Sequence, residues 1–286
     1  MGVISGVEGF VNIGGAAAER IANWTVDKTA DVQMKYASNT SGAPIAVAGN
    51  YDWSGSYEAF GAIPEVQPGA SFTFKGIFEP TSDKGVESDE NGTICDRVEI
   101  VWDQEGGSLI RHTCNFSANG ALTAGTITTP PEDSSTPEAE TSSGCLVKIS
   151  NPLADPSWSE LENVRGVRLS LMRDNKLYHA STTGQAPKRV MGNLSGELAI
   201  DLYISDPTGV EWYVNAAKYV QLYTAAATYW QLYGIMFTGV TGIGAPRETS
   251  DLIAVTLNGV FSGHNDISGT LTKGEITDPA SGDWWS

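Results

Sequence analysis

Cysteine and histidine are scarce in this 286-residue chain, which contains three of each. The cysteines are Cys95, Cys114 and Cys145, and no two of them have the CxxC spacing of a zinc or redox motif. An odd number of widely spaced cysteines is typical of a protein in a reducing compartment. It argues against a disulfide framework and against a structural zinc site.

Catalytic motifs are also missing. The chain has no GxSxG, HExxH or phosphate-binding loop pattern. Acidic pairs such as Asp89 and Glu90 lie in turns, and nothing marks two carboxylates that could face each other across a sugar. The sequence therefore predicts no catalytic residue, no cofactor and no metal site. At residues 88–92 a calcium-binding turn is the alternative to a solvated turn, because turn carboxylates suit a hard cation.

Basic residues are half as frequent as acidic ones, since 17 Lys and Arg against 34 Asp and Glu give a net charge of −17. Residues 1–131 contain 7 basic and 16 acidic residues, and residues 132–144 contain 4 acidic residues and no basic ones. Binding to nucleic acid through its phosphates needs clustered Lys and Arg. The excess of acidic residues therefore excludes binding to nucleic acid through its phosphates. It suits a soluble protein or a surface that DNA passes without binding.

Long apolar runs are absent, since no stretch approaches the roughly 20 residues of a membrane span. The first residues, MGVISGVEGFVNIGG, have neither a basic start nor a long apolar centre. They do not have the form of a signal peptide. We expect a soluble protein that is made in the cytoplasm and does not associate with membranes.

The most informative feature is an internal repeat. ASNTSGAPIAVAGN at residues 37–50 and ASTTGQAPKRVMGN at residues 180–193 share eight of fourteen positions at an offset of 143. Further matches follow in the same order: SG at 54 and 195, GIF at 76 and GIMF at 234, FS at 116 and 261, and LTAGTIT at 122 and LTKGEIT at 271. The order predicts a tandem duplication of a whole domain.

Residues 132–144 separate the two copies and are rich in Pro, Ser, Thr and acidic residues. This composition is typical of an exposed linker. We therefore expect a first domain at 1–131, a linker at 132–144 and a second domain at 145–286.

The periodicity within each copy is that of strands. Alternating runs at 97–102 and 108–114 flank an acidic, glycine-containing turn and predict a β-hairpin. Residues 71–78, 198–204 and 229–237 are further predicted strands, and residues 39–44 form a turn by composition between two strands. One helix is expected at about 208–220, with Asp206 or Thr208 as its cap. The predicted fold class is mainly β, with two tandem β-sandwich or barrel-like domains and a short helix in at least the second.

A family resemblance rests on residues of the first copy. From Asn23 and Trp24 the chain continues with DKTADV, NTSGAPIAVAGNYDWSGSYEAFG, PGASFTFKG, DRVEIVWDQEGG and NFSANG. This series resembles the major tail (tail tube) proteins of long-tailed bacteriophages. The motifs are packing and turn patterns that cover nearly all of the first copy. The second copy shares them more faintly through the repeat.

The resemblance implies a structural virion protein whose inner strands join those of its neighbours in six-domain rings, stacked into a tube that conducts the genome. With two copies per chain, three chains would close such a ring. Implied partners are further copies of the chain and the tail terminator, tape measure and tail tip proteins, while DNA passes without specific binding. The implied location is the phage tail, after synthesis in the host cytoplasm.

The resemblance also suggests which residues face the channel. The expected channel-facing acids are Asp27, Asp31, Asp52, Glu58, Asp174, Glu197 and Asp201. Four bases near the second copy of the motif conflict with a uniformly negative channel: Arg168, Arg173, Lys188 and Arg189. Apart from the resemblance, Trp284 and Trp285 at the end of the sequence are expected to contact a neighbouring subunit, because a terminus is rarely buried within its own fold.

Two other functions stay open at this level. A phage decoration protein with two β-sandwiches would not stack into tubes. A carbohydrate-binding module would need an exposed aromatic platform, which the eight tryptophans permit.

Overall fold

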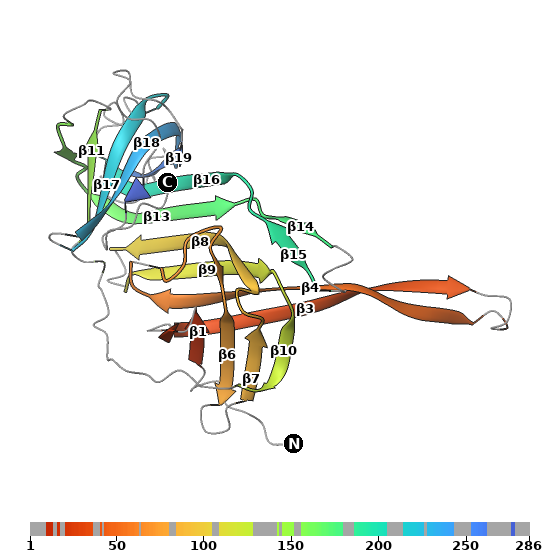
Figure 1. Cartoon of the computed structure of the whole chain (residues 1–286). Coiled ribbons are helices and arrows are strands. Elements are labelled where there is room, and N and C mark those ends of the chain that lie inside the picture. Colours follow the sequence, from red (N-terminus) through yellow and green to blue (C-terminus); the bar gives the residue numbers. More distant parts are fainter. Residues whose placement is uncertain are drawn as a thin grey trace.

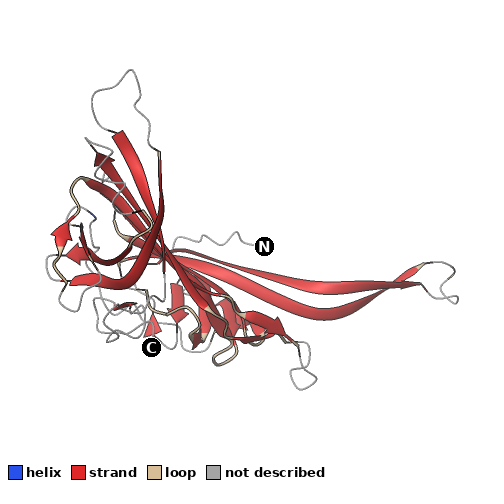
Figure 2. Ribbon diagram, turned by 90° about the horizontal axis from the view of Figure 1, so that it is seen from above, coloured by secondary structure: helices blue, strands red, loops and turns tan. Residues whose placement is uncertain are grey.

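The chain folds almost entirely into β-strands, so the mainly-β class is confirmed (Figures 1 and 2). This computed structural model describes residues 10–13, 16–17, 21–36, 41, 43–62, 64–79, 84–104, 109–127, 142, 145–151, 156–179, 186–204, 214–225, 228–242, 253–261 and 276–277.

The first half of the chain forms two sheets. β2, β1, β6, β7 and β10 make one sheet in that order, and β3, β4, β9 and β8 lie side by side in the other. In Figure 1 the strands β6, β7 and β10 run crosswise to β3, β4, β8 and β9. The bounds are β1 Phe10–Ile13, β2 Ala16–Ala17, β3 Ile21–Tyr36, β4 Pro44–Phe60, β5 Ser71–Phe72, β6 Phe74–Glu79, β7 Lys84–Ser88, β8 Thr93–Asp103, β9 Arg111–Ala118 and β10 Leu122–Thr126.

Aromatic side chains join these two sheets. The ring of Phe74 on β6 lies 4.7 Å from that of Phe116 on β9 and 5.9 Å from that of Trp24 on β3. Trp53 on β4 is 2% exposed and donates its indole N–H to the carbonyl oxygen of Gly120. The first half is therefore a sandwich with a common core.

The second half forms one sheet in the order β12, β11, β17, β18, β19, β16 and β13, with β20 paired to β18. A small hairpin, β14–β15, extends from it. The bounds are β11 Leu146–Ser150, β12 Ser159–Glu160, β13 Val164–Arg173, β14 Lys176–Tyr178, β15 Lys188–Val190, β16 Leu194–Ile204, β17 Ala217–Ala225, β18 Thr228–Thr241, β19 Ile253–Phe261 and β20 Ile276–Thr277.

The two halves have the same strand order. In the first half it is β2–β1–β6–β7/β8–β9–β4–β3, and in the second half it is β12–β11–β17–β18–β19–β16–β13. The single strand β18 takes the place of β7 and β8, which the turn at residues 89–92 separates. β10 pairs with β7 as β20 pairs with β18. We call residues equivalent when they hold the same place in this order and register.

The register matches in detail. In both halves the first long hairpin shifts by one residue at its start, between Ile21 and Asn23 and between Val164 and Gly166. The shift between Cys95 and Arg97 on β8 recurs between Phe237 and Gly239 on β18. A third shift, between Ile77 and Glu79, recurs between Tyr223 and Ala225. Across β3, β4 and β9 the equivalent residue lies 143 positions further on, at the offset of the sequence repeat.

The halves join edge to edge. β8 of the first half pairs antiparallel with β13 of the second over seven residue pairs, from Gly166 and Asp103 to Met172 and Arg97. The sheet thereby runs without interruption from β3 through β8 and β13 to β18 and beyond. One sheet, and not two separate sandwiches, is the frame of the molecule.

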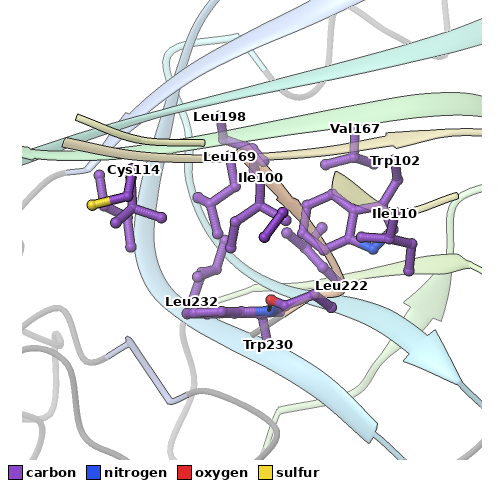
Figure 3. Close-up of a cluster of buried hydrophobic side chains, with 14 of the residues drawn as sticks. Ile100, Trp102, Ile110, Cys114, Val167, Leu169, Leu198, Leu222, Trp230 and Leu232 are labelled. Atoms are coloured by element: carbon purple, nitrogen blue, oxygen red, sulfur yellow. Dashed lines mark hydrogen bonds between the residues drawn. The ribbon is translucent and has the colours of Figure 1, made fainter. Parts of the chain in front are cut away.

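A shared core lies under this junction. Figure 3 shows Trp230, Leu222 and Leu232 of β17 and β18 facing residues of β13, β16 and β8, beside Trp102 and Ile110 of the first half. Trp230 is fully buried and donates its indole N–H to the carbonyl oxygen of Ala62, 3.1 Å away, in the first half. The two halves therefore depend on each other for burial of the large side chains at the junction, Trp230 and Trp102.

A long hairpin leaves the sheet at β3 and β4 (Figures 1 and 2). Its outer part, which we call the arm, is the paired segment Val32–Tyr36 with Pro44–Ala48. The residues of the arm are exposed on both faces. At the equivalent place the second half has the shorter hairpin β14–β15.

Most of the sequence-predicted elements are confirmed. β8 and β9 form the predicted hairpin, β5 and β6 cover 71–78, β16 covers 198–204, and β18 covers 229–237. The prediction of a helix at 208–220 is wrong for the residues that the structure describes. Residues 214–215 form a turn, and residues 217–220 begin β17. Pairing of β17 with β11 and β18 outweighs the local helical preference. Within 132–144 only Ser142 is described, and it is buried and hydrogen-bonded to the carbonyl oxygen of Asp103, unlike an exposed linker residue.

Candidate functional site

One face of the continuous sheet is mostly polar over six adjacent strands, from β3 to β16. Opposite residues of paired antiparallel strands project on the same side, so the register fixes which side chains share this face. The row of directly opposite residues that passes through Glu99 consists, from β3 to β16, of Asn23, Glu58, Thr113, Glu99, Ser170 and Glu197. The other side of the same strands carries the core residues. We call the first side the polar face.

Acidic residues outnumber basic ones on the polar face. Its acids are Asp27, Asp52, Glu58, Glu99, Asp103, Glu197 and Asp201, and its arginines are Arg97, Arg111 and Arg168. Glu58 and Asp201 are equivalent residues in the two halves. The face is therefore an acidic surface.

Five of the seven acids predicted to face a channel lie together on this face: Asp27, Asp52, Glu58, Glu197 and Asp201. The other two lie elsewhere. Asp31 falls in the register shift between Ala30 and Val32, where β3 leaves the sheet. Asp174 follows the end of β13 and forms an ion pair with Lys176. Sequence reasoning missed Glu99 and Asp103, which the alternation along 97–103 could have found.

Each arginine of the polar face has an acidic partner. Arg97 and Arg168 approach the carboxylate of Glu99 at 2.6 and 3.3 Å. Arg111 contacts Glu58 at 3.1 Å. Glu99, the two arginines beside it and Glu197 line a shallow groove of about 430 Å³. The cations are therefore locally neutralised, which limits their attraction for a polyanion.

The other three bases that conflicted with a negative channel hold the second half against the first. Arg189 binds Asp52 through both guanidinium nitrogens, at 2.8 and 3.1 Å. Lys188 donates to the carbonyl oxygen of Asn119 at 2.6 Å, and Arg173 to that of Pro68 at 3.0 Å. These bases clamp the junction, and sequence alone could not find their partners because those lie 69 to 137 residues away.

The sheet ends at β3 on one side and at the two-residue strand β12 on the other, and the end of β18 also keeps an open edge within the described part of the chain. β3 pairs with β4 only, along one side. β18 pairs with β17 no further than Met236, and Phe237 exchanges backbone hydrogen bonds with Asn215 and Ala216. Residues 238–242 of β18 follow, and no pairing on that side is described for them. Open edges of this kind are templates for pairing with another strand.

An apolar groove of about 520 Å³ borders the open edge of β3. It lies between the two sheets of the first half and is lined mainly by Trp24, Val26, Phe78, Val86 and Leu122. Phe78 is 42% exposed. An apolar groove next to an open strand edge is suited to receive a partner that also pairs with the edge.

A buried polar network lies inside the first half. His112 on β9 faces an acceptor at each ring nitrogen: the carbonyl oxygen of Gly61 at 2.9 Å and Oε2 of Glu65 at 3.1 Å. Tyr57 donates its hydroxyl to the same Glu65 oxygen at 2.8 Å. The network fixes the connection 61–66 against β4 and β9.

The carboxyl of Glu65 titrates at lower pH than usual. Burial alone would raise the pKa of Glu65, but the hydrogen bond and positive charge of His112, with further hydrogen bonds from the backbone and Tyr57, outweigh burial and lower this pKa. Burial raises the pKa of Tyr57 well above its usual value. Glu65 is therefore ionised in the folded protein near neutral pH.

This shift gives a pH prediction for Glu65→Gln. A carboxyl whose pKa is lower in the folded than in the unfolded state stabilises above its unfolded pKa, about 4.3, and this contribution is lost as pH falls through the folded pKa. At pH 7 we expect the variant to unfold about 1–3 kcal/mol more easily. Urea unfolding at stepwise pH should show wild type losing this advantage below about pH 4. An advantage unchanged between pH 7 and pH 3 would contradict the assignment.

The remaining sequence predictions have mixed outcomes. Of the tryptophans, Trp53, Trp102 and Trp230 are buried, as expected for core residues. Trp284 and Trp285 lie outside the described residues. In the turn at 88–92, the carboxylate of Asp89 accepts the N–H of Ala121 at 2.7 Å, so it joins this turn to the segment just before β10. Among the described residues no group of three or more metal-ligating side chains comes together, and no helix is long and apolar enough to cross a bilayer.

Comparison with known proteins adds no relative to this picture. No protein-family model matches the chain, and no curated protein sequence matches it.

Proposed function

We propose that this chain is a structural virion protein, a tail tube subunit of a long-tailed bacteriophage, in which three chains close a ring and rings stack around a channel for the genome. One observation carries the proposal. Two halves with the same strand order join edge to edge into a sheet with one acidic face and open edges at β3 and at the end of β18. A unit of this kind can repeat around a ring, because these open edges can pair with further copies.

The acidic face would line the channel. Its carboxylates repel the phosphates of DNA, and its arginines are paired with acids, so few free cations are left that could bind DNA with release of counterions. Arg173, Lys188 and Arg189 no longer oppose a negative lining, because they are engaged at the junction between the halves.

The arm would connect one ring to the next. Val32, Met34 and Tyr36 lie on one face of it and are 54%, 59% and 74% exposed, and Ile45 and Val47 on its other face are 44% and 41% exposed. A two-stranded ribbon has marginal stability in water. Apolar residues on both faces of a projecting ribbon therefore favour a partner, here a second copy in the neighbouring ring.

The proposal also places the chain among other proteins. In the virion the tube would enclose a tape measure protein and end at tail terminator and tail tip proteins, with DNA as a passing cargo. These partners follow from the family resemblance of the first copy. No enzymatic role is part of the proposal.

Electron microscopy of the purified full-length chain tests this function. We expect tubes with a regular axial repeat, an open central channel and three chains per ring, formed spontaneously or on concentration. Discrete particles that never stack would instead favour a decoration protein. Single monomers that neither close into rings nor stack at high concentration would overturn the tube proposal.

The described tryptophans do not favour sugar binding. Three of the five are buried, Trp24 packs against Phe74 and Phe78 at the apolar groove, and Trp158 is a single half-exposed ring. A carbohydrate platform needs aromatic faces open to solvent.

A further inference from the structure

We infer that β3 of one chain pairs antiparallel with residues 239–242 of β18 in the next chain, with Asp27 opposite Thr241 and Thr29 opposite Gly239. The inference rests on the proposed ring. It adds which edges meet, in which register, and through which side chains. The partner at both edges is a second copy of the same chain.

The junction inside the chain is the template for this pairing. There β13 pairs with β8, with Ser170 opposite Glu99 and Met172 opposite Arg97. β3 is equivalent to β13 at the constant offset of 143, so Asp27 and Thr29 take the places of Ser170 and Met172.

On the other strand, β18 is equivalent to β8. Arg97 lies opposite Asn115 and Glu99 opposite Thr113, while Gly239 lies opposite Asn258 and Thr241 opposite Thr256. Since Asn115 and Thr113 are equivalent to Asn258 and Thr256, Gly239 and Thr241 hold the places of Arg97 and Glu99. The pairing of β13 with β8 and these equivalences together fix the register between chains.

The open part of each edge begins at the same place. In the first half Cys95 exchanges backbone hydrogen bonds with Gly69 and Ala70, and pairing with β13 starts just after it, at Arg97. In the second half Phe237 exchanges the same two bonds with Asn215 and Ala216. Gly69 and Asn215 both have positive φ, 92° and 62°. The edge that β13 covers on β8 is thus the edge that stays open on β18.

Charge favours this pairing over the alternative. In a swapped arrangement, β3 of another chain would displace β13 from β8, and Asp27 would then lie directly opposite Glu99; like charges at opposite positions destabilise a sheet. Against β18, Asp27 instead faces the hydroxyl of Thr241, which is exposed on the polar face. The sequence difference between Glu99 and Thr241 therefore selects alternation of first and second halves around the ring.

The apolar groove at β3 gains an occupant by the same equivalence. Inside the chain, Ile110 is fully buried and lies with Trp102 beside Val167 and Trp230 (Figure 3). Val167 is equivalent to Trp24 and Trp230 to Val86, both of which line the groove. Ile253, equivalent to Ile110, is only half-buried in the isolated chain. We expect Ile253 of the neighbour to enter the groove.

Paired cysteine variants of the full chain test the register. Asp27→Cys with Thr241→Cys, and Thr29→Cys with Gly239→Cys, should form disulfides between chains under mild oxidation, giving a ladder that ends at three chains on a non-reducing gel. A side chain at Gly239 meets no atom within 4 Å, so the substitution fits the fold. The native cysteines are buried and should not contribute.

The crossed pairs are matched controls. Asp27→Cys with Gly239→Cys, and Thr29→Cys with Thr241→Cys, use the same four sites two residues out of register. Diagonal Cβ atoms are about 7–8 Å apart, too far for a disulfide. We expect at least a tenfold lower yield from the crossed pairs than from the direct pairs. If tubes form and the crossed pairs cross-link as well as or better than the direct pairs, the proposed register is wrong but the tube function still holds. If no rings or tubes form at all, the proposed function itself is wrong.

Discussion

Trp230→Ala is expected to lower the free energy of unfolding by about 3–5 kcal/mol, the range for removing a large buried aromatic side chain. Trp230 has no exposed surface and packs with Leu222 and Leu232 against the junction of the two halves. Its indole N–H also donates to Ala62 of the first half. One substitution therefore weakens the core of both halves.

Denaturant unfolding followed by circular dichroism measures this loss. Because the core is shared, wild type should unfold in a single transition, with a lower midpoint in the variant. Trp158→Ala is the matched control, since Trp158 is half-exposed and lies outside the common core. It should cost less than about 1.5 kcal/mol. Equal losses for the two variants, or two separate transitions in wild type, would contradict a core shared across the junction.

The double variant Val32→Asp with Met34→Asp is expected to abolish stacking and leave rings intact. Both side chains project from the same face of the arm, more than half exposed, away from the common core. The folded chain should therefore tolerate the change. In a stacked tube each aspartate would be buried without a partner in an apolar contact, which is strongly unfavourable.

Tube yield by negative-stain electron microscopy, with ring mass by native mass spectrometry, separates the two effects. We expect the tube yield to fall at least tenfold, which corresponds to about 1.4 kcal/mol per contact. Val32→Ile with Met34→Leu keeps the arm apolar and should stack like wild type. Tubes of normal length from the aspartate variant would remove the arm from the stacking contact.

Much of the fold could be predicted from the sequence where the signal is local. Alternation and a glycine-containing turn identified the β8–β9 hairpin, and the repeated fourteen residues at an offset of 143 mark the turns of two hairpins that the structure places in equivalent positions. The helix failed for a physical reason: residues 217–220 are helix-compatible alone, but strand neighbours on both sides supply the backbone partners.

The individual short matches between the two copies predicted equivalent residues less reliably than the order of the matches predicted the duplication. Gly76–Phe78 lies on β6, which is equivalent to β17, whereas Gly234–Phe237 lies on β18. Likewise Leu122 and Thr123 are equivalent to Ile276 and Thr277, the last two residues of LTKGEIT, and not to its first two, Leu271 and Thr272. Packing explains how equivalent positions diverge. Gly55 leaves room for Phe116 on the next strand, while in the second half the large residue is Leu198 and the glycine is Gly259. The total side-chain volume of the two opposite positions is conserved, but the large residue and the glycine have exchanged strands. Neither position therefore keeps its residue type between the halves.

The acidic site divides in the same way. Alternation was enough to place Asp52 with Glu58, and Glu197 with Asp201, on one face of their own strands, because the side-chain period of a strand is fixed by its backbone. That period does not say which strands are neighbours. The ion pair of Arg189 with Asp52 joins residues 137 positions apart, and no local rule relates them.

The sequence by itself determined the strands, their alternation, the acidic balance and the doubled motif, since all of these depend on residues close together in the chain. Only the tertiary structure decided that β8 meets β13, that the polar faces of both halves merge, and that β3 and residues 238–242 keep open edges. Strand neighbours are selected by burial of the common core around Trp230 and by hydrogen bonding along whole edges. Both are sums over residues far apart in sequence, and they exist only once the chain has folded.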